Sequence, residues 1–219
     1  MALQETHLQE ELMGAKIRRE EISAVYHLTW IDNLASIFNL DGLQSKAFLA
    51  RNRIRHVRTS GNLQSLLTDH AAGNWDKVRL TWRWPHPMFF GMENKQLLCL
   101  IAINPEIALS QEAIFTDSNS HDYTHTRKAG WDGLRQVDFD AVRQGFPNTK
   151  ETKRLMQAEI LVPHVPLDFF QRIVLGSEAS RKMAQSVSRH YPACQHLFEV
   201  DSNFFYGKHK LPARQLQLI

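Results

Sequence analysis

One carboxylate stands inside an apolar strand near the end of the chain. Glu159 lies in Gln157-Ala158-Glu159-Ile160-Leu161-Val162, and Pro163 ends the run. Carboxylates are rarely buried unless another group pairs with them. A rigid strand that holds such a group at the lip of a cleft is typical of a catalytic carboxylate. Position alone favours the plainer interpretation, in which the side chain faces water at the strand end.

A second group of polar residues surrounds a predicted helix start near residue 30. A short strand at 25–29 ends at Thr29, which resembles an N-cap with Asp32 three residues on. Strand, turn and helix would bring His27, Thr29 and Asn33 together. Because backbone N–H groups point outward at a helix start, this arrangement favours an anion or a ligand carbonyl.

Positive charge is concentrated in two stretches, although the net charge is only +3. Guanidinium groups suit phosphate oxygens, so these clusters are candidates for a phosphate-rich ligand. The alternative is a solvated basic face. The residues concerned are Arg51, Arg53, Arg55, His56 and Arg58, followed by Lys77, Arg79 and Arg83.

The motifs of several enzyme classes are missing, which argues against a Rossmann oxidoreductase, a P-loop NTPase and a zincin. The chain has no Gly-x-Gly-x-x-Gly, no Walker loop, no His-Glu-x-x-His and no Gly-x-Ser-x-Gly. His121, Asp122 and His125 are the nearest approach to a metal site, but a third clear ligand is lacking, so no metal is expected.

Composition predicts an ordinary soluble protein. No apolar run approaches the roughly 18 residues that span a membrane, so no membrane partner is expected. The start of the chain does not resemble a secretory signal. Cys99 and Cys194 match no metal spacing, and Cys99 lies in an apolar run where a buried inert thiol is expected. These features favour the cytoplasm.

Short mixed elements predict an α+β fold with one domain at residues 25–219, preceded by an N-terminal helical extension at 1–24.

Phe89 and Phe90 cannot both point inward from one strand, so one of them is a candidate for base stacking, with Trp75, Trp82 and Trp84 as further aromatic candidates. Helices are predicted over 3–22, 62–72, 138–144 and 177–190, and strands over 77–84, 88–90, 97–103, 173–175 and 197–200.

Four segments in order resemble the DarT family, ADP-ribosyltransferase toxins that modify single-stranded DNA. The resemblance covers about residues 25–176. The segments are Tyr26-His27-Leu28-Thr29-Trp30-Ile31-Asp32-Asn33-Leu34-Ala35-Ser36-Ile37; Trp84-Pro85-His86-Pro87-Met88, similar to the family's Asn-Pro-x-x-Pro-Met; Phe115-Thr116-Asp117 with Val137-Asp138-Phe139-Asp140; and the strand of Glu159.

The resemblance implies NAD as the substrate that donates ADP-ribose. It also implies an ADP-ribosyltransferase-like fold, in which two small antiparallel sheets surround an NAD cleft with helices at the periphery. The implied partners are single-stranded DNA and a macrodomain antitoxin.

The resemblance also assigns roles to individual residues. It gives Glu159 the catalytic role. His27 and Thr29 would hold the nicotinamide end of NAD, with Asn33 nearby. On the nucleic-acid side stand Met88, with His86 beside it, and the loop at 149–154, which contains Lys153 and Arg154.

One departure concerns the family's arginine, which lies in an Arg-Arg pair on a helix. Aligning Ala47-Phe48 with the family places Arg55 at this position, whereas aligning the predicted helix at 62–67 leaves no arginine there. We therefore expect Arg55 or Arg51 to serve the catalytic site, with Arg58 and Arg79 as alternatives.

Three functions remain open from the sequence. The first is an NAD-dependent transferase acting on a thymine or guanine of single-stranded DNA. The second is a related transferase whose acceptor is RNA or protein. The third is an inactive relative that still binds nucleic acid. This function is favoured by the lack of an unambiguous match to the family's arginine.

Overall fold

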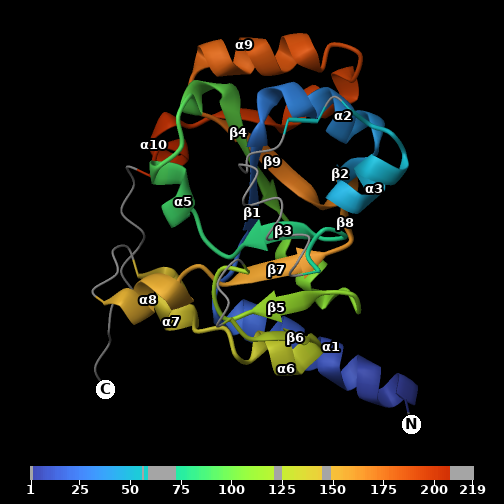
Figure 1. Cartoon of the computed structure of the whole chain (residues 1–219), viewed down its shortest axis with the longest axis vertical. Helices are drawn as coiled ribbons and strands as arrows, with labels where there is room; N and C mark the ends of the chain where they lie inside the picture. The colour runs from blue at the N-terminus through green and yellow to red at the C-terminus, as the bar shows by residue number, and fades with distance from the viewer. Residues whose placement is uncertain (1, 56, 59–72, 121–124, 145–148, 208–219) are drawn as a thin grey trace.

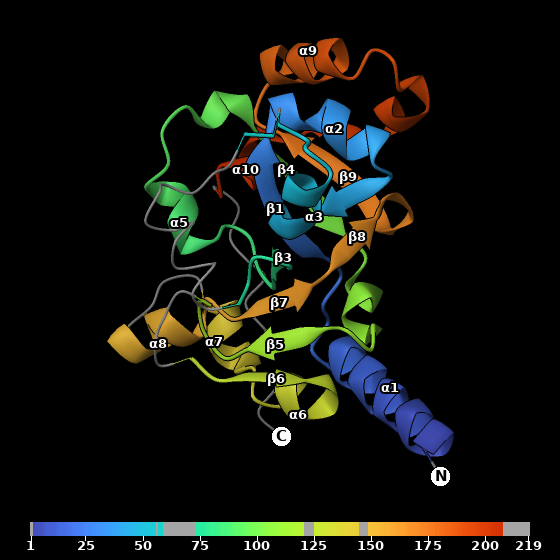
Figure 2. The same cartoon turned by 45° about the vertical axis from the view of Figure 1, so that its right-hand side comes forward.

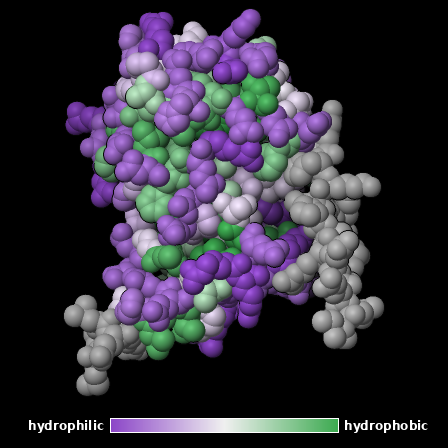
Figure 3. All heavy atoms as spheres, turned by 180° about the vertical axis from the view of Figure 1, so that it is seen from behind, coloured by the Kyte–Doolittle hydropathy of each residue, from purple (hydrophilic) through white to green (hydrophobic). Residues whose placement is uncertain are grey.

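The computed structural model describes residues 2–55, 57–58, 73–120, 125–144 and 149–207. The predicted helix over 62–72 lies outside these residues, as do His121 and Asp122 of the conceivable metal grouping. Within the described part, none of the helices combines the length and apolar character that a membrane span needs. Its face seen from behind is mostly polar, with smaller apolar areas on it (Figure 3).

Eight strands of the described residues form the main sheet, in the order β10-β9-β4-β1-β3-β7-β5-β6. Neighbouring strands are antiparallel except β9 and β10, which are parallel. The strands are β1 Val25–Trp30, β3 Val78–Thr81, β4 Leu98–Ile103, β5 Ile114–Thr116, β6 Arg127–Ala129, β7 Glu159–Val162, β9 Phe170–Leu175 and β10 Phe198–Val200.

This sheet consists of two four-stranded halves that are joined by a single residue pair. β1 pairs with β4 over its whole length, and β3 pairs with β7 from Val78 to Thr81. Between β1 and β3, by contrast, the register contains the single pair Tyr26–Thr81. β1 and β4 run along the long axis of the molecule, whereas β7 and β5 cross it (Figures 1 and 2). The predicted α+β class with two small sheets is thus confirmed, with one parallel pair as a correction.

Helices cover the two ends of this sheet (Figure 1). α9 packs against β9 and β10, while α1 packs against α6 beside the other half. The helices are α1 Ala2–Arg19, α2 Leu34–Asn39, α3 Lys46–Arg51, α5 Pro87–Phe90, α6 Gly130–Leu134, α7 Phe139–Arg143, α8 Lys150–Leu155, α9 Glu178–Val187 and α10 Ser202–Phe205, with 3-10 turns at Ile31–Asn33, Lys95–Leu97, Pro105–Leu109, Leu167–Phe169 and Pro192–Leu197.

Most predicted elements are found close to their expected positions. α1 and β4 match the helix at 3–22 and the strand at 97–103. Asp138 and Ser177 cap α7 and α9 with their side chains, as Asp and Ser at N-cap positions do. Cys99 is fully buried, and burial raises the pKa of its thiol, so the prediction of an inert core cysteine is confirmed.

Two local predictions are wrong. Residues 88–90 form the helix α5 rather than a strand, because Pro87 occupies its first turn and His86 caps it. Thr29 does not cap a helix: it is the fifth residue of β1, and the turn after Trp30 begins without any side-chain cap. Thr29 instead accepts a hydrogen bond from the Asn33 amide at 3.0 Å.

A separate two-stranded antiparallel sheet consists of β2 (Gly42–Gln44) and β8 (His164–Pro166). Gly42 has a φ of +131°, and a Cβ there would lie 2.1 Å from the carbonyl oxygen of Val165. Glycine is therefore required both by the backbone conformation and by the close approach of the neighbouring strand.

We expect Gly42→Ala to lower the free energy of unfolding by about 1–3 kcal/mol, the usual cost of a forced backbone conformation. Gly91→Ala is the matched control, because the nearest atom to its added Cβ is 3.9 Å away and its φ is −84°. Urea denaturation of both variants measures the difference, and equal stability of the two would contradict the close packing of β2 against β8.

Candidate active site

A cleft of about 410 Å³ opens where β1 and β3 diverge. Its wall is built from both halves of the sheet and from α2, β2, α3 and the start of α5. It brings together His27, Thr29, Asn33, His86, Met88 and Glu159, six residues that the sequence singled out. These residues are up to 132 positions apart in the chain, yet they line one cavity.

Glu159 is buried, with 5% of its surface exposed, at the first position of β7. Its Oε2 accepts a hydrogen bond from the backbone N–H of Ser120 at 2.9 Å. Within the described residues its Oε1 has no hydrogen bond and no cation pairs with the carboxylate. A buried carboxylate without a counter-charge is costly, so this side chain is suited to a ligand that develops positive charge.

The loop after β5 holds Glu159 in place. The hydroxyl of Thr116 accepts the backbone N–H of Glu159 at 3.1 Å and donates to the carbonyl of Ser118 at 2.6 Å. Ser118 and Ser120 are buried as well. This hydrogen-bonded loop connects the Phe115-Thr116-Asp117 segment to the carboxylate and gives that segment a physical role.

Arg79 is the cation that this loop places in the cleft. Its Nη1 donates to the hydroxyl of Ser120 at 3.2 Å, so one serine contacts both the guanidinium and, through its backbone, Glu159. Arg79 projects from β3 and lines the cleft. Carboxylate and guanidinium thereby lie on either side of a single residue, an arrangement that suits a ligand with both cationic and anionic parts.

His27 faces the same cleft with a defined tautomer. Its Nδ1 lies 3.0 Å from the backbone carbonyl of Arg79 and therefore carries the proton, since a carbonyl only accepts. Nε2 is left with a lone pair and acts as an acceptor. Burial lowers the pKa of this imidazole, so the neutral form dominates at neutral pH.

Asn33 acts as a clamp on the chain rather than as an open ligand group. Its amide nitrogen donates to Thr29 at 3.0 Å and to the carbonyl of Arg58 at 2.8 Å, and its oxygen accepts the N–H of Arg58 at 2.7 Å. The Arg58 guanidinium in turn stacks over Trp30, 3.4 Å from the ring centroid. Asn33 therefore fixes a basic side chain at the edge of the cleft.

The start of α5 forms the other rim of the cleft. His86 is buried and caps α5 by accepting the N–H of Met88 at 3.3 Å. Met88 is 52% exposed and Phe90 60% exposed, while Phe89 is buried against Trp84. Of the two phenylalanines, Phe90 therefore remains as the stacking candidate. Trp82 and Trp84 belong to the core.

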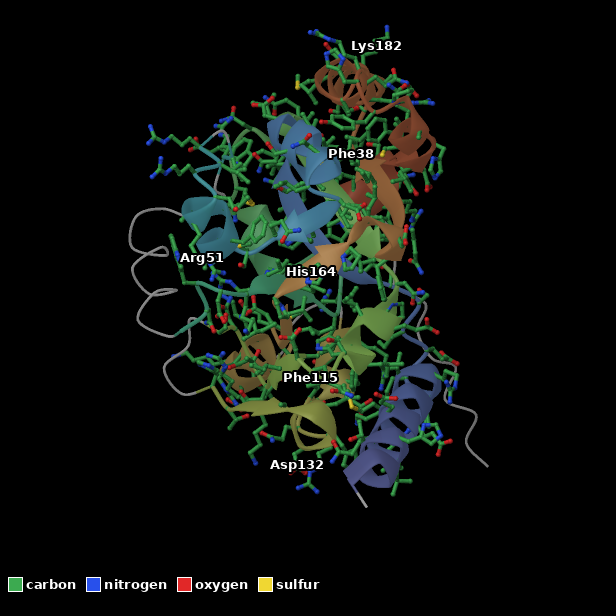
Figure 4. The ribbon with its side chains drawn as sticks, turned by 90° about the vertical axis from the view of Figure 1, so that its right-hand side faces the viewer. Phe38, Arg51, Phe115, Asp132, His164 and Lys182 are labelled. Carbon is green, nitrogen blue, oxygen red and sulfur yellow. The ribbon has the colours of Figure 1, made fainter. Side chains whose placement is uncertain are left out.

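The structure places the other predicted site residues outside the cleft lining. Arg51 and Arg55 are exposed, and Arg51 lies at the margin of the molecule on α3 (Figure 4). Lys153 is exposed on α8. Arg154 pairs with Glu151 at 2.9 Å and donates to the Ser118 hydroxyl at 3.1 Å, so it braces the loop that supports Glu159.

Sequence reasoning missed Ser120 as a site residue and named Arg79 only as an alternative. The spacing of Phe115-Thr116-Asp117 before the Glu159 strand was the available signal for the supporting loop. No local pattern marks Ser120, because its contribution is a backbone N–H.

A sequence model of the family described as "ssDNA thymidine ADP-ribosyltransferase, DarT" matches residues 26–206 of the chain. A search of curated proteins found none that matches the chain.

Solved structures of similar fold come from the same family. The chain superposes on Thermus sp. 2.9 DarT in complex with ADP-ribosylated ssDNA with a TM-score of 0.71 and 16% identity, covering 85% of this chain and 97% of that one. For Thermus sp. 2.9 DarT in complex with NAD+ the TM-score is 0.68, with 14% identity and coverage of 85% and 98%. Thermosipho africanus DarTG in complex with ADP-ribose gives 0.68 and 18%, covering 84% of this chain and 51% of that one.

We expect Asn33→Ala to lower the free energy of unfolding by about 1–3 kcal/mol, because it leaves the backbone groups of Arg58 without their partner. Asn52→Ala is the matched control: this exposed amide makes one hydrogen bond, to Phe48 at 2.8 Å, and we expect a change within about 0.5 kcal/mol. Urea denaturation measures both, and an equal change in the two variants would argue against the clamp.

Proposed function

The chain belongs to the DarT family of ssDNA thymidine ADP-ribosyltransferases, and from this we propose that it transfers ADP-ribose from NAD+ to a thymine of single-stranded DNA, with Glu159 as the catalytic carboxylate. The observation that carries the assignment to Glu159 is its buried side chain in the cleft, with Oε2 fixed by Ser120 and Oε1 without a partner among the described residues. The same cleft is lined by His27 and Thr29, two of the residues that the resemblance assigns to NAD.

The reaction breaks the bond between C1″ of the ribose and the nicotinamide nitrogen, and the electron pair leaves with the nicotinamide. The sugar develops the positive charge of an oxocarbenium ion, which a nearby carboxylate stabilises. In thymidine N1 carries the deoxyribose, so N3 is the ring nitrogen left to attack. As N3 bonds to C1″, its proton passes to Glu159 acting as general base.

NAD+ fits the cleft by charge and hydrogen bonding. The acceptor Nε2 of His27 suits a hydroxyl or amide N–H of the nicotinamide riboside, beside the hydroxyl of Thr29. Arg79 and Arg58 line the same cavity, and their guanidinium groups suit the pyrophosphate. The apolar side chains of α2 and α3 offer a surface for the adenine, with Trp75 nearby.

We expect Glu159→Gln to lower the rate of transfer at least 100-fold, because a neutral amide neither stabilises the oxocarbenium ion nor accepts the proton. The matched control is Glu106→Gln, an exposed glutamate away from the cleft, which should retain wild-type activity. Mass spectrometry of thymine-containing oligonucleotides incubated with NAD+ measures the adduct. Wild-type labelling by Glu159→Gln would refute the assignment.

The arginine that serves NAD+ is also proposed from the geometry. Arg79 contacts Ser120 and lines the cleft, whereas Arg51 and Arg55, the residues favoured by the sequence, are exposed outside its lining. We therefore propose Arg79 as the principal arginine of the site.

Arg79→Met should raise the KM for NAD+ or lower kcat by an overall factor of at least 10 in kcat/KM, since a charge-assisted hydrogen bond contributes about 1.5–3 kcal/mol. Arg51→Met and Arg55→Met preserve side-chain length and should change kcat/KM less than threefold. Steady-state kinetics with oligonucleotide and NAD+ compares the three. A large loss in Arg55→Met with none in Arg79→Met would restore the alignment-based choice.

The nucleic acid is proposed to enter at α5, where Met88 and Phe90 form an exposed apolar rim, and to meet Lys153 on α8. A macrodomain antitoxin is a further proposed partner, supported by the likeness to DarTG of Thermosipho africanus. A cytoplasmic location, where NAD+ and DNA occur together, belongs to the same proposal. So does the division into an extension at 1–24 and a transferase domain at 25–219, supported by the family match from residue 26.

A further inference from the structure

His86 carries a buried donor that no described residue satisfies. The residue is 3% exposed, and Nε2 has no hydrogen-bond partner within the described part of the chain. Leaving such a group unpaired destabilises the protein, because the donor has lost its hydrogen bonds to water. Because His86 lines the cleft, a ligand is the natural partner for this nitrogen.

The tautomer of His86 follows from its role as a helix cap. Nδ1 accepts the backbone N–H of Met88 at 3.3 Å and therefore carries a lone pair. In the neutral ring the proton must then be on Nε2. His86 thus offers an N–H donor, whereas His27, which lines the same cleft, offers an acceptor.

The charge state of His86 is also set by its surroundings. Burial is the main cause that lowers its pKa to about 4; Glu159 opposes this shift, and Arg83 and Arg79 contribute to it. The ring is therefore neutral at neutral pH and keeps its tautomer. A neutral imidazole N–H is a recognised donor to an oxygen that gains negative charge during a reaction.

His86 stands on the side of the cleft where we place the incoming base. It begins α5, and the exposed Met88 and Phe90 follow it on the same short helix. His27 and Thr29, which we assign to the nicotinamide riboside, project from β1. The donor is therefore better placed for the acceptor base than for the leaving group.

We propose that His86 is a catalytic residue whose Nε2–H donates a hydrogen bond to a carbonyl oxygen of the target thymine, next to the attacking N3. The inference rests on the proposed function, which supplies thymine as the acceptor. N3 lies between the carbonyls C2=O and C4=O, so charge left when its proton departs spreads onto both oxygens. A fixed donor at one of them stabilises the transition state in the manner of an oxyanion hole.

The step balances without a further reactant. The N3–H proton passes to Glu159, the N3–C1″ bond forms, and the C1″–nicotinamide bond breaks with its electron pair. His86 keeps its own proton throughout. Its contribution is confined to the charge on the carbonyl oxygen.

Two substitutions separate the donor from the cap. His86→Asn keeps an oxygen that can cap α5, since Asn is a favoured N-cap, but removes the donor at the Nε2 position. His86→Gln reaches further and can return an N–H near that position. We expect His86→Asn to lower the rate of transfer to thymine by about 100- to 1000-fold and His86→Gln to recover part of this loss.

The test pairs these variants with oligonucleotides that carry 2-thiothymine or 4-thiothymine at the target position, because sulfur is a poorer hydrogen-bond acceptor than oxygen. Transfer rates are measured by mass spectrometry for wild type and both variants. If His86 donates to one carbonyl, the ratio of rates for oxygen and sulfur at that position should be larger in wild type than in His86→Asn. Comparing ratios between enzymes cancels the intrinsic reactivity of each base.

Three results would overturn the inference. The first is a transfer rate of His86→Asn equal to that of wild type. The second is an equal loss of rate by His86→Asn on the oxygen substrate and on both sulfur substrates. The third is a wild-type enzyme that transfers to the 2-thio and the 4-thio substrate at the same rate. A wild-type enzyme that labels none of the three oligonucleotides would instead overturn the proposed function itself, and the donor role with it.

Discussion

The single pair Tyr26–Thr81 is the constraint on which this architecture depends. Had β1 and β3 continued to pair, the sheet would have been continuous and its backbone groups satisfied strand to strand. Because the strands separate after one pair, the backbone carbonyl of Arg79 accepts a hydrogen bond from the His27 side chain instead of from a neighbouring strand. The divergence opens a cleft lined by both polar and apolar side chains, next to strands such as β4 and the remainder of β7 that are apolar. The proposed active site thus lies where the regular hydrogen-bond ladder is interrupted.

Electrostatics inside this cleft follows from how Glu159 is supported. Its described partners are neutral, a backbone N–H from Ser120 and the hydroxyl of Thr116 at its own N–H. A direct ion pair would have stabilised the resting carboxylate and weakened its attraction for a cationic sugar. Arg79 is held one residue away through the Ser120 hydroxyl, so positive and negative charge are both present but separated. The loop that contains Ser118 and Ser120 therefore fixes the position of Glu159 without neutralising the charge that the proposed chemistry requires.

The sequence was informative where local physics decides the outcome. Neighbouring residues were enough to predict the strand in the apolar run Leu98–Ile103, which contains the buried Cys99. The same holds for the helix starts at Asp138 and Ser177. The conformation of 88–90 could not, because β-propensity of the two phenylalanines competes with the helix start set by Pro87 and His86. The position of Arg79 in the cleft lining and the clamp made by Asn33 could not be predicted for another reason. They depend on which segments meet across the cleft, which no short pattern encodes.

The two histidines show how a cleft of this kind can recognise a ligand without adding charge. Each ring uses Nδ1 on the protein backbone, His27 as donor to Arg79 and His86 as acceptor from Met88. These opposite backbone contacts fix opposite tautomers, so the two Nε2 atoms differ in hydrogen-bonding sense. Burial lowers both pKa values, and neither ring competes with Arg79 and Arg58 as a cation at neutral pH. The backbone of β3 and of α5 thus determines which of the two histidines accepts a hydrogen bond in the cleft and which donates one.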